Sequence, residues 1–360
     1  MNRRLFQSES AMGKPFLPFR RWAKRAFRFR VVTLLALTLV AAIWFAFKFY
    51  REPITSQNLS LLRPIRTIEK DVWQIRSSPD RTRLALVSWE QPVDIREMQT
   101  LLPIQTLCQS RKVIHFAFSS DPNVIAFCEN SKTVEVVNRE IDRSIQIATA
   151  NPQPKMEFSP DGRLLATGGY GNAAFLWSVA DGSLVHQLNI GSATGGLTAR
   201  FSPDGDTLAI GNRNGATRLF DVSTGTERLV LHKEMSQGLE FHPSGDRLAI
   251  GYTDGSIVVW ETVSGRRVAQ KATPADEIYC VAWSPDGNLL ASCGRNGDIV
   301  IWDGPTLTPL HRFAAPPWVI YVCFSPDGAR LISAGGDFIN TQTRKVRVWG
   351  VPLTQRLLGR

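Results

Sequence analysis

The sequence predicts an all-β protein, a seven-bladed β-propeller of four-stranded blades that is preceded by one transmembrane helix. Three observations predict it. A five-residue turn motif recurs at a nearly constant period, hairpin signals fall at one register in successive repeats, and an uncharged apolar run precedes the first repeat.

The turn motif is Phe158-Ser-Pro-Asp-Gly162. It returns as Phe201–Gly205, Trp283–Gly287 and Phe324–Gly328, and in a looser form as Phe241–Gly245. The aromatic residue suits a buried strand position, Pro presets the φ angle of a turn, Asp bonds to its own backbone, and Gly takes the strained φ. Each copy therefore predicts a strand end followed by a tight turn.

The period becomes visible when these turns are aligned. The aligned anchor positions are Ser77, Phe118, Phe158, Phe201, Phe241, Trp283 and Phe324, at spacings of 40 to 43 residues. An apolar residue follows each anchor by seven positions, and five repeats place a large apolar residue twelve positions further on. The seventh repeat reaches Trp349 only after eighteen, which indicates an insertion of six residues.

Turn pairs divide each repeat into four strands. Asn214-Gly215, Asp254-Gly255 and Asn296-Gly297 occur at one register and are typical of type I′ hairpins. A further turn pair, such as Asp181-Gly182, follows the third strand. A four-stranded unit of about 40–45 residues matches a propeller blade. A β-sandwich, the alternative for short regular strands, would give no such fixed period.

From about Leu61 to the C-terminus the chain resembles the WD-repeat (Trp-Asp repeat) β-propeller family. The resemblance rests on the turns above, on the segments that end Leu-Ala-Thr-Gly-Gly169 and Leu-Ala-Ser-Cys-Gly294, and on Trp302-Asp303. The Gly-His pair that the family usually places before the innermost strand is missing. In the fifth repeat, Ile250 stands where family members often carry Ser or Thr.

The resemblance also implies how the ring closes. The family lends an N-terminal strand to the last blade, and Leu61–Ile68 is a spare strand before the first repeat. With this strand the count reaches 28, which is seven blades of four. Pro64 fits an outermost position, where a missing N–H costs little.

The N-terminal residues lie outside the repeats. Residues 1–30 hold nine Lys or Arg and one acid, and Val31 to Phe47 carries no charge. We interpret residues 1–30 as a basic cytoplasmic tail, 31–50 as a transmembrane signal anchor, 51–60 as a linker and 61–360 as the propeller. The positive-inside rule then places the propeller on the extracytoplasmic side of the membrane.

Three alternatives to this interpretation stay open. The apolar run is also compatible with a buried helix of the soluble domain, although its basic flank fits that badly. A cleaved signal peptide is a second alternative, but no small-residue cleavage site follows the run. The third is a cytoplasmic propeller on an inverted anchor.

The positive charge of the chain is concentrated at its beginning. The formal net charge is +10, but from Glu52 onward basic and acidic residues are equal in number. The propeller is therefore about neutral, and a basic groove for a nucleic-acid backbone is not expected.

We expect no catalysis, cofactor or metal. The sequence holds no P-loop, no His-Glu-x-x-His and no Gly-x-Ser-x-Gly, and its five histidines lack metal-ligand spacing. Its five cysteines form no Cys-x-x-Cys pair and are typical of small core residues, with one disulfide left open.

The resemblance implies a membrane-tethered scaffold that binds a partner protein or peptide on one propeller face. The family's usual contact face is built from the loops that lead into each innermost strand and from the hairpins between second and third strands. In this chain those positions hold Trp318, Trp89, Tyr170, Arg213, Tyr252, Arg295, Lys233 and Glu234. Trp318 leads this set, since a loop tryptophan is costly to leave in water. The alternative function is a small-ligand binder or hydrolase that uses the central channel.

Overall fold

The computed structural model describes residues 53–72, 74–88, 91–129, 132–150, 155–191, 197–212, 215–232, 235–273, 277–315, 317–336 and 344–350. The predicted basic tail, residues 1–30, and the predicted membrane segment, residues 31–50, lie outside this set. None of the helices in the described ranges has the length and apolar character needed to span a bilayer.

The described residues form 28 strands in seven four-stranded antiparallel sheets, as the repeat count predicts. A short 3₁₀ helix, η1 (Leu59–Leu61), precedes the first strand. Blade 1 comprises β2 (Gln74–Ser77), β3 (Arg83–Val87), β4 (Val93–Glu97) and β5 (Pro103–Leu107). Blade 2 comprises β6 (His115–Phe118), β7 (Val124–Cys128), β8 (Thr133–Asn138) and β9 (Arg143–Ala148). Blade 3 comprises β10 (Lys155–Phe158), β11 (Leu164–Gly168), β12 (Ala173–Ser178) and β13 (Leu184–Asn189).

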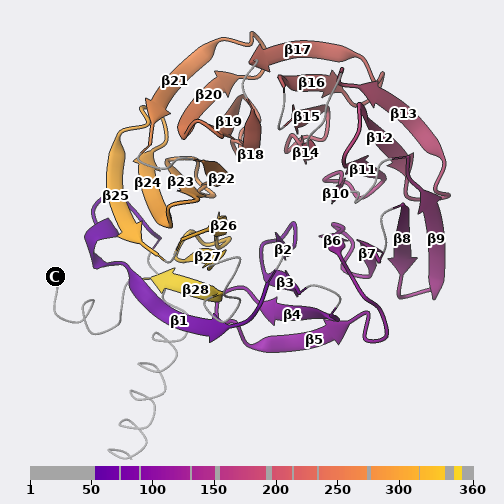
Figure 1. Ribbon diagram of the computed structural model, residues 1–360, viewed down its shortest axis with the longest axis horizontal. Helices are drawn as coiled ribbons and strands as arrows, with labels where there is room; N and C mark the ends of the chain where they lie inside the picture. The colour runs from indigo at the N-terminus through magenta and orange to yellow at the C-terminus, as the bar shows by residue number, and fades with distance from the viewer. Residues whose placement is uncertain are drawn as a thin grey trace, which may run out of the picture. The chain divides into compact units, whose positions relative to one another are not determined.

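The remaining blades repeat this order. Blade 4 comprises β14 (Leu197–Phe201), β15 (Thr207–Asn212), β16 (Thr217–Asp221) and β17 (Glu227–His232). Blade 5 comprises β18 (Ser236–Phe241), β19 (Arg247–Tyr252), β20 (Ser256–Glu261) and β21 (Arg267–Ala272). Blade 6 comprises β22 (Ile278–Trp283), β23 (Leu289–Gly294), β24 (Asp298–Asp303) and β25 (Pro309–Ala314). Blade 7 comprises β26 (Val319–Phe324), β27 (Leu331–Gly335), β28 (Lys345–Gly350) and, from the N-terminal side, β1 (Arg63–Glu69). The first strand of each sheet lies innermost in the ring (Figure 1).

Closure of the ring follows the prediction. β1 pairs antiparallel with β28, so the indigo and yellow ends of the described chain meet in one blade (Figure 1). Pro64 lies on this outermost strand opposite Trp349, next to a register shift. Its missing N–H therefore falls where the ladder is already interrupted. Ile54 and Leu59 are buried as well, so this part of the predicted linker packs against the propeller.

The hydrophobic core is divided among the junctions between blades. Seven clusters of buried side chains occur, and each joins two consecutive blades, including the last and the first. Glycines at the ends of second strands permit close approach of the next blade. A Cβ on Gly251, for example, would lie 2.3 Å from the side chain of Ile278. All five cysteines are free thiols, and Cys128, Cys293 and Cys323 are buried.

The recurrent turn has the structure that its residues predict. In blade 3 the Gly162 N–H donates to the Ser159 carbonyl (2.9 Å), and Gly162 adopts a φ of 75°. Asp161 accepts hydrogen bonds from the Ser159 hydroxyl (2.6 Å) and the Arg163 N–H (3.1 Å). The Ser159 hydroxyl in turn accepts from the Leu164 N–H (2.9 Å), which ties the turn to the next strand. The hydroxyl holds the pKa of Asp161 below its usual value, as befits a structural carboxylate.

The alternating strand directions give the ring two distinct faces. We call the side of the Ser-Pro-Asp-Gly turns the turn face. The opposite side, with the loops that lead into innermost strands and the hairpins between second and third strands, is called the loop face.

Candidate functional site

Two of the predicted contact residues come together on the loop face. Trp318 precedes β26 of blade 7, and Arg295 begins the hairpin between β23 and β24 of blade 6. The backbone N–H of Trp318 donates to the backbone carbonyl of Arg295 (2.8 Å). The guanidinium carbon of Arg295 lies 4.8 Å from the centroid of the Trp318 indole ring. This is a cation–π contact. The guanidinium is exposed and the indole is half-buried.

Three further residues extend this contact across blades 5 and 6. The ring of Tyr279 stacks on the indole, with centroids 6.0 Å apart and planes 12° from parallel. The Tyr279 hydroxyl donates to Glu277 (2.8 Å), and the Gln237 side-chain amide donates to the same carboxylate (3.3 Å). We define the Trp318 cluster as Trp318, Arg295, Tyr279, Glu277 and Gln237. The sequence interpretation missed its last three members.

A β-bulge explains how strand residues join a loop cluster. The ladder between the first and second strands shifts register at Gln237 in blade 5, at Tyr279 in blade 6 and at Ile320 in blade 7. The corresponding ladders of blades 1 to 4 show no register shift within the described strands. A bulge leaves one residue out of the pairing and redirects its side chain. In the sequence, the only feature that the three bulged residues share is their position, because each lies four residues before the aligned anchor of its blade.

The backbone at Trp318 is strained. Trp318 adopts a φ of 64°, a left-handed conformation that costs a bulky residue on the order of 1–3 kcal/mol. The Gly336 N–H donates to the Trp318 carbonyl (3.3 Å), which helps to hold this geometry. Such strain persists only where surrounding contacts enforce it, so the position of the indole is fixed by its neighbours.

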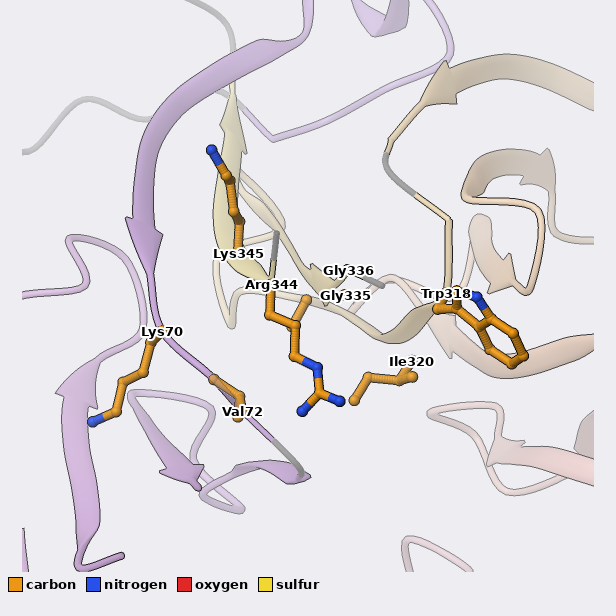
Figure 2. Close-up of a pocket in the computed structure, with 9 residues that line it drawn as sticks. Lys70, Val72, Trp318, Ile320, Gly335, Gly336, Arg344 and Lys345 are labelled. Carbon is orange, nitrogen blue, oxygen red and sulfur yellow. The ribbon is translucent and has the colours of Figure 1, made fainter. Parts of the chain in front are cut away.

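A small cavity borders the cluster at the junction of blades 7 and 1. Its volume is about 10 Å³, which is enough for at most one water molecule. Figure 2 shows the indole of Trp318 directed away from Arg344 and Lys345, while the Arg344 guanidinium extends toward Val72 and Ile320. Arg344 forms an ion pair with Asp71. The cavity is therefore too small for a ligand. The ion pair between Arg344 and Asp71 links blade 7 to the segment that leads into blade 1.

Of the other predicted contact residues, the structure describes Tyr170 and Tyr252, and neither belongs to the Trp318 cluster. Tyr170 lies on the hairpin of blade 3 and is 50% exposed. The remaining four, Trp89, Arg213, Lys233 and Glu234, lie outside the described residues, as does the inserted segment from 337 to 343.

Tyr252 requires a correction, because it is fully buried at the end of β19 and cannot contact a partner. Its hydroxyl accepts a hydrogen bond from the Trp260 indole N–H (3.3 Å). In blade 6 the equivalent indole, Trp302, donates to the Ser292 hydroxyl (2.9 Å). Ile250 cannot accept this hydrogen bond in blade 5, and Tyr252 supplies the hydroxyl from two residues further along the strand.

A second cavity, larger than the one beside Trp318, lies on the turn face. A cavity of about 550 Å³ lies among the innermost strands and their turns, within the size range of small-molecule sites. The residue just before each aligned anchor lines it, in chain order Arg76, Ala117, Glu157, Arg200, Glu240, Ala282 and Cys323. We call these seven residues the channel layer. Within the described ranges, no three His, Cys, Asp or Glu side chains are grouped so as to hold a metal ion.

Comparison with known proteins agrees with this architecture. The family described as "WD domain, G-beta repeat" matches residues 155–178 and 269–303. The family described as "Anaphase-promoting complex subunit 4 WD40 domain" matches residues 231–283. Together with the seven four-stranded blades, these matches support a WD-repeat propeller.

Individual relatives are similar over short segments. The human apoptotic protease-activating factor 1 is 46% identical over 68 residues, which cover 16% of this chain and 5% of that protein. The guanine nucleotide-binding protein subunit beta of Oryza sativa subsp. indica is 26% identical over 88 residues, which cover 23% of each chain. The chain thus spans less than a quarter of the length of these curated relatives.

Proposed function

We propose that this protein is a membrane-tethered scaffold that binds a partner protein or peptide on the loop face of its propeller and performs no catalysis of its own. The Trp318 cluster is the observation that carries the proposal. It presents an aromatic ring, a guanidinium and a carboxylate within one patch that spans blades 5 to 7. Tryptophan, tyrosine and arginine are the residue types that most often dominate binding energy at protein interfaces.

The rigidity of the patch supports the same function. Trp318 and Tyr279 are held by stacking and by backbone hydrogen bonds before any partner arrives. Less conformational entropy is then lost on binding, because the contact side chains are already ordered. The partner is expected to place an apolar or aromatic side chain against the outer surface of the indole.

Replacing Trp318 tests the contact surface. In Trp318→Ala we expect crosslinking and pull-down of the partner to fall at least about tenfold, because a buried aromatic anchor typically contributes 2 kcal/mol or more. Leu184→Ala is the matched control, since Leu184 is 49% exposed but lies on the outermost strand of blade 3. Equal partner recovery from Trp318→Ala and the unchanged protein would remove this site assignment.

The orientation of the membrane tether is tested by the access of a protease to the propeller. The run from Val31 to Phe47 carries no charge, and nine basic residues precede it, which predicts a propeller outside the cytoplasm. Protease added to intact spheroplasts is therefore expected to degrade the propeller, and permeabilised cells provide the control for protease access. A propeller that is cleaved only after permeabilisation would contradict this orientation.

A further inference from the structure

The carboxylates of the channel layer are already engaged by arginines. Glu157 forms an ion pair with Arg200 and accepts a hydrogen bond from the Phe201 N–H (3.1 Å). Glu240 lies 3.6 Å from Nε of Arg200 and 3.5 Å from a terminal nitrogen of Arg81. Two acids thus share two arginines, and the third carboxylate of the lining, Asp80, accepts hydrogen bonds within its own turn from Ser78 and Thr82.

Arg81 reaches Glu240 from the far side of the ring. It belongs to the turn of blade 1, has a φ of 52°, and contacts Glu240 of blade 5. The same guanidinium donates to the Trp283 carbonyl of blade 6 (3.5 Å). Its side chain therefore crosses the cavity and encloses part of it.

Arg76 is the third cation of the cavity. Its guanidinium donates to the Ile75 carbonyl (3.3 Å), and none of the described carboxylates lies within ion-pairing distance of it. Enclosure by the cavity walls and the nearby charge of Arg200 lower the pKa of Arg76 to about 10. The group is half-buried and keeps its positive charge at neutral pH, and the charge of the more distant Glu157 partly opposes the lowering of its pKa.

The rest of the cavity wall combines apolar residues with turn serines such as Ser78 and Ser159. Phe118, Phe158, Phe201 and Phe241 line it beside the charged layer, together with turn prolines such as Pro160. The space of about 550 Å³ greatly exceeds the volume of an inorganic anion. Ligand sites commonly combine such apolar walls with a small number of charged groups that fix orientation.

We propose that the central cavity binds a small organic anion, whose carboxylate or phosphate head pairs with the guanidinium of Arg76 and whose apolar body lies against the turn prolines and the small exposed parts of the phenylalanines. The guanidinium fork fits either head group with two parallel hydrogen bonds. The cavity lining holds three arginines and three carboxylates, and the ligand provides a direct counter-ion for the one lining arginine that has no described carboxylate within ion-pairing distance. This site lies on the turn face and does not depend on the function proposed for the loop face.

Fluorine NMR on the full-length protein in detergent tests the proposal. The probes are para-fluorobenzoate and para-fluorophenyl phosphate, with para-fluorobenzylammonium as a cation of similar size. We expect at least one anion to show saturable line broadening and the cation to show none. Comparison of the two anions identifies the preferred head group. Absence of saturable binding by both anions would overturn the proposal.

Three variants connect the binding to the cavity. Arg76→Gln should weaken the anion at least about tenfold, because charge-assisted hydrogen bonds to arginine are lost. Arg143→Gln carries the same charge change on the exposed start of β9 and should bind like the unchanged protein. Glu240→Gln removes a competing acid and should tighten binding, a gain that misfolding cannot imitate. Unchanged affinity in Arg76→Gln, or weaker binding in Glu240→Gln, would contradict the assignment.

Discussion

A chain that begins at Lys70 is expected to lose the folded propeller, whereas a chain that begins at Glu52 is expected to keep it. The shorter chain lacks β1 and leaves one edge of β28 unpaired. It also lacks Ile54, Leu59 and Leu62, which are buried between blades 6 and 7. Burial of such side chains contributes roughly 1.5–3 kcal/mol each. Their combined loss is therefore on the order of 5 kcal/mol, comparable with the whole stability of many domains.

Urea unfolding monitored by tryptophan fluorescence and near-ultraviolet circular dichroism checks this prediction. Both chains lack the apolar N-terminal run, so they differ only in the closing segment. We expect one cooperative transition for the chain from Glu52 and no comparable transition for the chain from Lys70. Two identical transitions would show that β1 does not hold the ring closed.

Gly335→Ala is expected to lower the free energy of unfolding by about 3 kcal/mol, at the upper end of the usual range for overpacked sites. A Cβ on Gly335 would lie 2.4 Å from the Trp318 carbonyl oxygen and 2.5 Å from Cα of Val319. Both are backbone atoms, so no side-chain rotation can relieve the clash. The start of β26 must move, and the stacking of Trp318 on Tyr279 changes with it.

Gly215→Ala is the control for this substitution. Gly215 occupies the hairpin region of blade 4, and its nearest neighbour would be the side-chain nitrogen of Asn212 at 3.2 Å, a longer approach than at Gly335 and one to a side chain rather than to the backbone. Denaturant titration should separate the two variants by at least about 1 kcal/mol. We also expect Gly335→Ala to weaken partner binding. Equal stability of the two variants would mean that the backbone approach at Trp318 carries no constraint.

The ring could be predicted from the sequence because each blade carries its own local signals. The motif Phe158–Gly162 forms the turn that its residues specify, and repetition of that turn fixes the number and phase of the blades. The closing strand was implied by the resemblance to WD-repeat propellers, and the strand count agreed with it. Local chemistry and periodicity together determine this architecture.

The candidate sites were less accessible to sequence reasoning, because they depend on contacts between blades. Tyr279 reads as an ordinary strand residue until a bulge redirects its side chain toward Trp318. Tyr252 was expected at the loop face, but its hydroxyl is needed inside blade 5, where Ile250 provides none. The sequence does not show that Glu157 and Glu240 form their ion pairs with Arg200 and Arg81 rather than with Arg76, because these contacts join different blades.

The pairing of β1 with β28 also constrains the order of folding. The ion pair between Glu69 and Lys345 (2.8 Å) joins residues 276 positions apart. During synthesis the residues of β1 are made before those of any other strand. They can pair only after Lys345–Gly350, the residues of β28, have been made. Contacts at such long separation form slowly, and unpaired edges invite association with other chains in the meantime. The strand that closes the ring therefore has to wait, unpaired, until the seventh blade has been synthesised.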